Sequence, residues 1–189
     1  MTLITNWYSL DNKEGANLNV PYTSVDTSSA PNPSVPAAPF ALGERCQGNN
    51  DSEWMFVRAT VTVTQYMAVA INNNGIVVGT LTSALVVSNA YSYGFAQFQT
   101  STCNAGDYFW ALLKAAGGIA LNISPSATAQ GLLYISGTAG TFTSSVTADA
   151  MNNLWLVASI GTSASSPGEG AMRGYLMPAL NLLVAGATV

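Results

Sequence analysis

Residues 53–81, EWMFVRATVTVTQYMAVAINNNGIVVGTL, decide the expected fold of this chain. From Glu53 onward, apolar and polar side chains alternate. The apolar set comprises Met55, Val57, Ala59, Val61 and Val63, and the polar set comprises Arg58, Thr60, Thr62 and Thr64. A period of two places successive side chains on opposite faces of a β-strand. The stretch therefore predicts a strand with one buried face and one solvent-facing side.

A tight turn is expected in the second half of the same stretch. Two apolar runs, YMAVAI at 66–71 and GIVVGTL at 75–81, flank three asparagines and Gly75. An Asn-Gly pair readily adopts the positive φ angles that a short hairpin turn requires. The two runs are predicted to pair as a β-hairpin.

Short apolar runs continue along the chain, each bounded by Gly, Asn, Ser or Pro. They are YGFAQFQ (93–99), DYFWALLKA (107–115), GIALNIS (118–124), GLLYIS (131–136), GTFTSSVTA (140–148) and LWLVASIG (154–161). Regular short strands separated by turn residues are typical of a barrel or a sandwich. Helix signals are weak, and residues 177–184 could form a short helix or a terminal strand. The glycine-rich segment SPGEGAMRG (166–174) is interpreted as a loop.

The first 40 residues differ from the rest of the chain. Five of the eight prolines fall within PYTSVDTSSAPNPSVPAAP (21–39), where proline removes backbone donors and serine competes for them. The sequence therefore predicts two parts. Residues 1–40 form an extended Pro/Ser-rich N-terminal arm, and residues 41–189 form an all-β domain, a β-barrel or β-sandwich of short antiparallel strands. A disordered linker is the alternative for the arm.

The arm carries the candidate partner-binding residues, which are Trp7, Tyr8, Tyr22 and Val35. A segment with so little internal structure must offset its ordering entropy through contacts made elsewhere. Buried aromatic side chains are common anchors of such contacts. We expect the arm to be ordered only against a neighbouring subunit, and the β domain to fold without it.

The composition favours a protein that assembles with other protein. Charged residues make up 7% of the chain, against about 25% in ordinary soluble domains, and 49% of the residues are hydrophobic. A surface with so few charges tends to be covered by neighbours. A small domain kept soluble by Ser, Thr and Asn is the alternative. Self-association, as a homotrimer, is the expectation.

Nucleic acid and membrane are not expected partners. The basic residues do not cluster; they are Lys13, Arg45, Arg58, Lys114 and Arg173. No stretch approaches the roughly 18 apolar residues of a membrane helix, and the N-terminus lacks the pattern of a secretory signal. We expect the chain to fold in a cytoplasm, where Cys46 and Cys103 would be two free, buried thiols.

The sequence offers little catalytic machinery. It contains no histidine, which excludes Ser-His-Asp catalysis and imidazole zinc sites. A carboxylate pair for glycoside hydrolysis would have to use Asp51, Glu53 or Asp149. Asp51 lies in a turn-like stretch, and Glu53 is expected to face water or pair with an arginine. We predict no catalytic residue, no metal ligand and no cofactor.

Two segments carry a resemblance to a known family. LGERCQGNNDSEWMFVRA (42–59) has Leu-Gly, a short polar turn, then Ser-Glu-Trp and an alternating strand. YGFAQFQTSTCNAGDYFWALLKAAG (93–117) has an Ala-Gln strand followed by Gly-Asp-Tyr and a tryptophan-bearing strand. These patterns, with the closing GEGAMRGYLMPALN (168–181), resemble capsid decoration (cement) proteins and related head proteins of tailed bacteriophages.

The resemblance implies a β-barrel or β-sandwich protein, often trimeric, that binds major capsid subunits on the exterior of the virion and stabilises the head. It assigns no catalytic residue. A reading from a different class is an adhesion module that binds surface glycans through exposed aromatics such as Tyr91 and Tyr93. A glycan-cleaving enzyme is the third reading and ranks last.

Overall fold

The computed structural model describes residues 6–11, 13, 15–23, 38–82, 92–100, 102–115, 118–123, 132–135, 138–143, 150–156 and 167–172. These residues contain strands and no helix. The strands are β1 Arg45–Gly48, β2 Ser52–Ala59, β3 Val63–Thr64, β4 Ala68–Ile71, β5 Ile76–Thr80, β6 Ser92–Ala96, β7 Thr102–Cys103, β8 Tyr108–Lys114, β9 Gly118–Asn122, β10 Leu132–Ile135, β11 Phe142–Thr143, β12 Ala150–Leu156 and β13 Pro167–Met172. The all-β prediction is confirmed.

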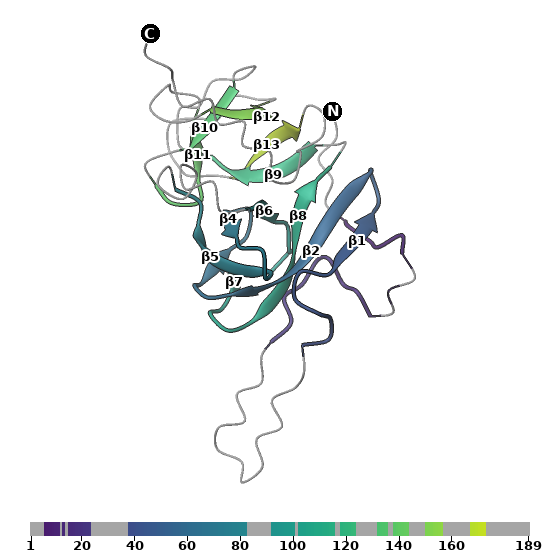
Figure 1. Cartoon of the computed structure of the whole chain (residues 1–189). Coiled ribbons are helices and arrows are strands. Elements are labelled where there is room, and N and C mark those ends of the chain that lie inside the picture. Colours follow the sequence, from purple (N-terminus) through teal and green to yellow (C-terminus); the bar gives the residue numbers. More distant parts are fainter. Residues whose placement is uncertain are drawn as a thin grey trace.

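A small closed barrel forms the centre of the molecule (Figure 1). Its strands follow the order β2-β5-β4-β6-β8, and β8 pairs with β2 to close the sheet. Neighbouring barrel strands are antiparallel except β2 and β5, which are parallel. β1 extends the sheet beyond β2, and the short strands β3 and β7 pair with each other. Of the two architectures that the sequence predicted, this sheet is therefore a barrel and not a sandwich.

The predicted hairpin is present as β4 and β5, which pair antiparallel across residues 72–75. Gly75 has a φ of 72°. The Asn72 side-chain oxygen accepts hydrogen bonds from the backbone N–H groups of Asn74 and Ile76, at 2.9 and 3.0 Å. A Cβ on Gly75 would lie 2.3 Å from the backbone nitrogen of Gly43. Glycine is thus required here both for the turn and for a close backbone approach.

A second sheet, in the order β11-β10-β12-β13-β9, lies beside one end of the barrel (Figure 1). The Gln97 side chain links the two sheets: its amide nitrogen donates to the Ala120 carbonyl at 2.7 Å, and its oxygen accepts from the Ala120 N–H at 3.3 Å. The prediction of a loop at 166–174 is wrong, since β13 pairs with both β9 and β12. Hydrogen bonding along both edges outweighs the low strand propensity of its glycines.

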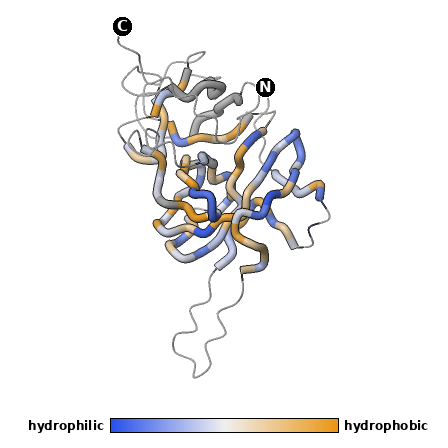
Figure 2. The backbone as a smooth tube through the Cα atoms, viewed as in Figure 1, coloured by the Kyte–Doolittle hydropathy of each residue, from blue (hydrophilic) through white to orange (hydrophobic). Residues whose placement is uncertain are grey.

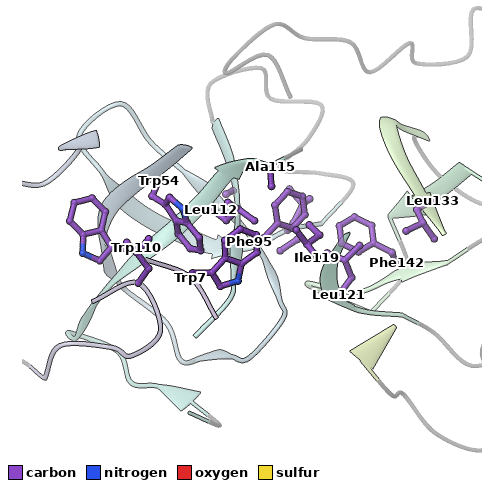
Figure 3. Close-up of a cluster of buried hydrophobic side chains, with 14 of the residues drawn as sticks. Trp7, Trp54, Phe95, Trp110, Leu112, Ala115, Ile119, Leu121, Leu133 and Phe142 are labelled. Carbon is purple, nitrogen blue, oxygen red and sulfur yellow. The ribbon is translucent and has the colours of Figure 1, made fainter. Parts of the chain in front are cut away.

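Buried side chains form two clusters. The inner cluster uses one face of the barrel strands and comprises Met55, Val57, Ala59, Val63, Val69, Ile71, Val77, Ala96, Phe98, Cys103, Phe109, Ala111 and Leu113. The outer cluster uses the opposite face, including Trp54, Phe56, Phe95, Trp110 and Leu112, and continues into the second sheet through Ile119, Leu121, Leu133 and Phe142 (Figure 3). Hydrophobic residues accordingly follow the barrel strands, whereas the turn between β1 and β2 is hydrophilic (Figure 2).

The alternation from Glu53 does not correspond to one buried and one exposed face of β2. Met55, Val57 and Ala59 face the inner cluster as predicted, but Trp54 and Phe56 on the other face are also fully buried. β2 is therefore buried on both faces along this part, and the half-buried prediction is wrong there. The strand also ends at Ala59, leaving Val61 37% exposed. The covering layer that the local pattern could not reveal includes the N-terminal arm.

Candidate functional site

The arm packs on the barrel of its own chain. Trp7 is 2% exposed and contacts Trp54 edge-to-face, with ring centroids 5.1 Å apart. The Asn19 side chain holds the Trp7 backbone by accepting from its N–H at 3.0 Å and donating to its carbonyl at 2.6 Å. In the single chain, the Trp7 ring therefore belongs to the outer cluster of its own chain, and its predicted role in binding a partner stays a prediction.

Residues 8–10 add a short antiparallel segment to the edge of β1. Ser9 pairs with Gly48, the Leu10 N–H donates to the Gln47 carbonyl at 2.8 Å, and the Asn49 N–H donates to the Tyr8 carbonyl at 3.0 Å. The Asn49 side chain also accepts from the Tyr8 N–H at 3.1 Å. This pairing covers an edge that would otherwise present unpaired backbone groups.

Strand-like alternation within the arm directs two apolar side chains outward. Trp7 is buried, whereas Tyr8 is 56% and Leu10 is 62% exposed. Large apolar side chains held this far in solvent, two positions apart on one segment, form a candidate contact surface. We call Tyr8 and Leu10 the arm pair. Tyr8 was predicted as a binding residue, and its exposure is consistent with that role; Leu10 was missed, although the alternation Trp-Tyr-Ser-Leu could have revealed it.

The charged side chains near the arm pair are bound within the chain. Gln47, beside Leu10, is in register with Glu53, and Glu53 is in register with Lys114. Glu53 forms an ion pair with Arg45, which confirms that it pairs with an arginine, and Lys114 lies 3.2 Å from an Asp51 oxygen.

A third ion pair, between Lys13 and Glu44, ties the arm to the chain just before β1. Its hydrogen bond raises the pKa of Lys13, and the same bond, with the Ala41 N–H, lowers the pKa of Glu44. These three ion pairs therefore balance six charged side chains near the arm pair, and the Asp11 carboxylate beside Leu10 accepts from the Gln47 N–H at 2.7 Å. Asp51 and Glu53, the carboxylates considered for glycoside hydrolysis, form ion pairs with Lys114 and Arg45, respectively.

The other predicted binding residues are placed differently. Tyr22 is half-buried; its ring lies 6.0 Å from that of Phe40 and 5.6 Å from that of Phe56, and its hydroxyl donates to the Gly15 carbonyl at 3.0 Å. In the single chain it contacts its own barrel, and its predicted role in partner binding stays a prediction. Val35 lies outside the described residues.

Both cysteines are buried and free, one in each cluster. Burial raises the pKa of Cys46 to about 11 and that of Cys103 to about 12. Thiols of this kind are weak nucleophiles near neutral pH because the thiolate is scarce. Both residues act as small apolar core residues, as the sequence predicts.

The described part of the chain holds no group of three or more metal-ligating acidic or cysteine side chains. Among these same residues there is no apolar helix of membrane-spanning length. Of the aromatics proposed for glycan binding, Tyr93 packs partly against the outer cluster, and Tyr91 lies outside the described residues, as does Asp149. No protein-family model, curated protein or solved structure matches this chain.

Proposed function

We propose that this chain is a non-enzymatic structural protein of a phage head, a capsid cement protein that binds major capsid subunits. The observation that carries the proposal is the arm pair: two large apolar side chains held in solvent by backbone pairing with β1. A fixed apolar contact loses little entropy on binding. The low charge of the chain and the resemblance of residues 42–59 and 93–117 to cement proteins support the same function.

The proposed partners are the major capsid protein and further copies of this chain, as a homotrimer on the virion exterior. The three ion pairs near the arm pair neutralise charges that would otherwise repel a neighbouring protein of like charge. Many weak contacts repeated over a shell would stabilise it through multivalency.

The test is binding to undecorated heads. Purified protein is mixed with them, bound copies per head are counted, and the temperature of DNA release is measured. We expect the double variant Tyr8→Ser/Leu10→Ser to lose at least tenfold in head affinity while keeping its fold. Val61→Ser is the matched control, because Val61 is also an exposed apolar residue but lies beyond the opposite end of β2. Equal binding by the double variant and the control would refute the role of the arm pair.

Failure of the unaltered protein to bind heads at all would refute the cement function. Retention on a glycan array in that case would favour the adhesion module instead.

A further inference from the structure

We propose that residues 6–22 of one copy occupy the arm site of a second copy, so that assembled chains are linked by exchanged arms. The arm site is the barrel surface on which these residues lie, built from β1, β2 and β8. The inference rests on the self-association in the proposed function. It names the contact by which copies are joined.

The arm contacts the barrel at a few separate points. The Trp7 ring packs on Trp54, and Ser9 pairs with Gly48. Tyr22 and Tyr108 form a bridge in which each backbone N–H donates to the other carbonyl, at 2.7 and 2.9 Å.

Other bonds hold the arm together internally, including those from Asn19 to Trp7 and from the Tyr22 hydroxyl to Gly15. The arm is therefore a unit whose contacts would be the same on a second copy. Identical contacts cancel when the two arrangements are compared.

The segment between the arm and β1, which we call the connector, decides whether the arm binds its own chain or a second copy. Residues 24–37 are 14 residues, which can span at most about 50 Å. In the intrachain arrangement the two ends of this connector lie close together, since the Tyr22 and Phe40 rings are 6.0 Å apart. The chain thus has the reach for a neighbouring arm site.

The composition of the connector is typical of a chain that resists bringing its two ends together. It contains three prolines, Pro31, Pro33 and Pro36, and four serines. Proline restricts its own φ and pushes the preceding residue toward extended backbone. Chains of this type act as semi-rigid spacers, for which bringing the ends together is costly.

Proximity decides when exchange occurs. A tether of this length gives an arm a local concentration of at most the millimolar range at its own site, and a connector that resists bringing its ends together lowers that concentration. A neighbouring copy in an oligomer or on a shell presents its arm site at a comparable concentration. Exchange is therefore expected in the assembled state, where the stiffness of the connector favours the neighbour.

The test uses a donor chain with Leu10→Cys and an acceptor chain with Gln47→Cys. Leu10 and Gln47 lie opposite each other across the arm–β1 pairing, and both are exposed. Facing residues of an antiparallel pair lie within the Cα separation that a disulfide accepts. The full-length chains are coexpressed with different tags, purified at a concentration where they self-associate, oxidised with copper phenanthroline, and separated without reductant.

With donor and acceptor chains mixed at random in equal amounts, we expect about half of the donor chains to become linked to acceptor chains, because the other donor arms reach donor chains. A donor with Val61→Cys should not be linked. A single chain with both substitutions measures how efficiently the pair closes. Complete closure within that chain, with no donor–acceptor product, would overturn the proposal. So would a strictly monomeric protein, and neither result depends on binding to heads.

A second thiol pair guards against a poor fit of the first. Tyr8 and Asn49 also lie opposite each other across the arm–β1 pairing. A donor with Tyr8→Cys is therefore coexpressed with an acceptor with Asn49→Cys. The mixed product supports exchange, and closure only in the chain that carries both thiols overturns it.

Discussion

Replacing Trp7 with alanine tests whether the arm is part of the folded barrel. The Trp7 ring is 2% exposed and packs edge-to-face on Trp54. The substitution leaves the backbone groups that Asn19 binds, so the measured loss comes from the indole ring. Removing a buried tryptophan side chain typically costs about 3–5 kcal/mol, including the cavity that remains.

That loss is large against the roughly 5–15 kcal/mol that stabilises an ordinary domain. For a chain of this size it corresponds to a decrease in Tm of roughly 6–20 °C. Urea titration followed by far-ultraviolet circular dichroism gives the free energy of unfolding without depending on tryptophan fluorescence. Tyr8→Ala is the matched control, because Tyr8 is the neighbouring aromatic and is 56% exposed; we expect a change within about 0.5 kcal/mol.

A Trp7→Ala variant within about 1 kcal/mol of the unaltered protein would refute the reasoning. The β domain would then be stable without the arm, as the sequence suggested. With Trp7 and Leu18 buried in the outer cluster, deletion of residues 1–39 should instead destabilise the β domain. The truncated chain is expected to unfold at a lower urea concentration than the full chain.

Gly48→Ala would place a Cβ 2.5 Å from the Ser52 hydroxyl and 2.8 Å from the Trp54 indole nitrogen, so we expect a loss of about 1–3 kcal/mol by urea titration; stability equal to the unaltered protein would contradict this. Cys46 and Cys103 should resist a thiol reagent at pH 8 in the folded protein and both react after denaturation; rapid labelling of the folded chain would contradict their burial. Because both folded-state pKa values lie above the ordinary 9.0, their contribution to stability should be complete below about pH 9 and be lost as the pH rises toward 11–12, which melting curves measured across that range will check.

Local patterns predicted the strands well because strand formation leaves a short-range signal. The hairpin at 66–81 and the runs that became β6, β8, β9 and β10 all have apolar residues bounded by turn residues. Barrel closure depends on pairing between β2 and β8, which are about 50 residues apart, and no local pattern encodes it. For the same reason β13 was missed: its glycines carry no strand signal, and only pairing with β9 and β12 orders them.

The placement of the arm was the least predictable feature. Its prolines and serines predict a segment without regular structure of its own, but composition cannot show which surface such a segment covers. Trp54 and Phe56 gave an indirect signal, since a strand with large aromatics on the face opposite its predicted buried face needs a covering layer. That layer turned out to include the same chain's Trp7.

Several residues that carry the resemblance have structural roles in this chain. The Ser52 hydroxyl accepts the Trp54 indole N–H at 2.8 Å, and Glu53 binds Arg45. Gly106 has a φ of 98° and donates its N–H to the Ala59 carbonyl at the start of β8.

Residues with such roles specify a barrel, and proteins can share them without sharing a partner. Binding must be specified by side chains that the barrel does not need, and the arm pair, Tyr8 and Leu10, meets that condition because both side chains are mostly exposed. A decisive test of function is therefore one that alters these two residues and leaves the signatures intact.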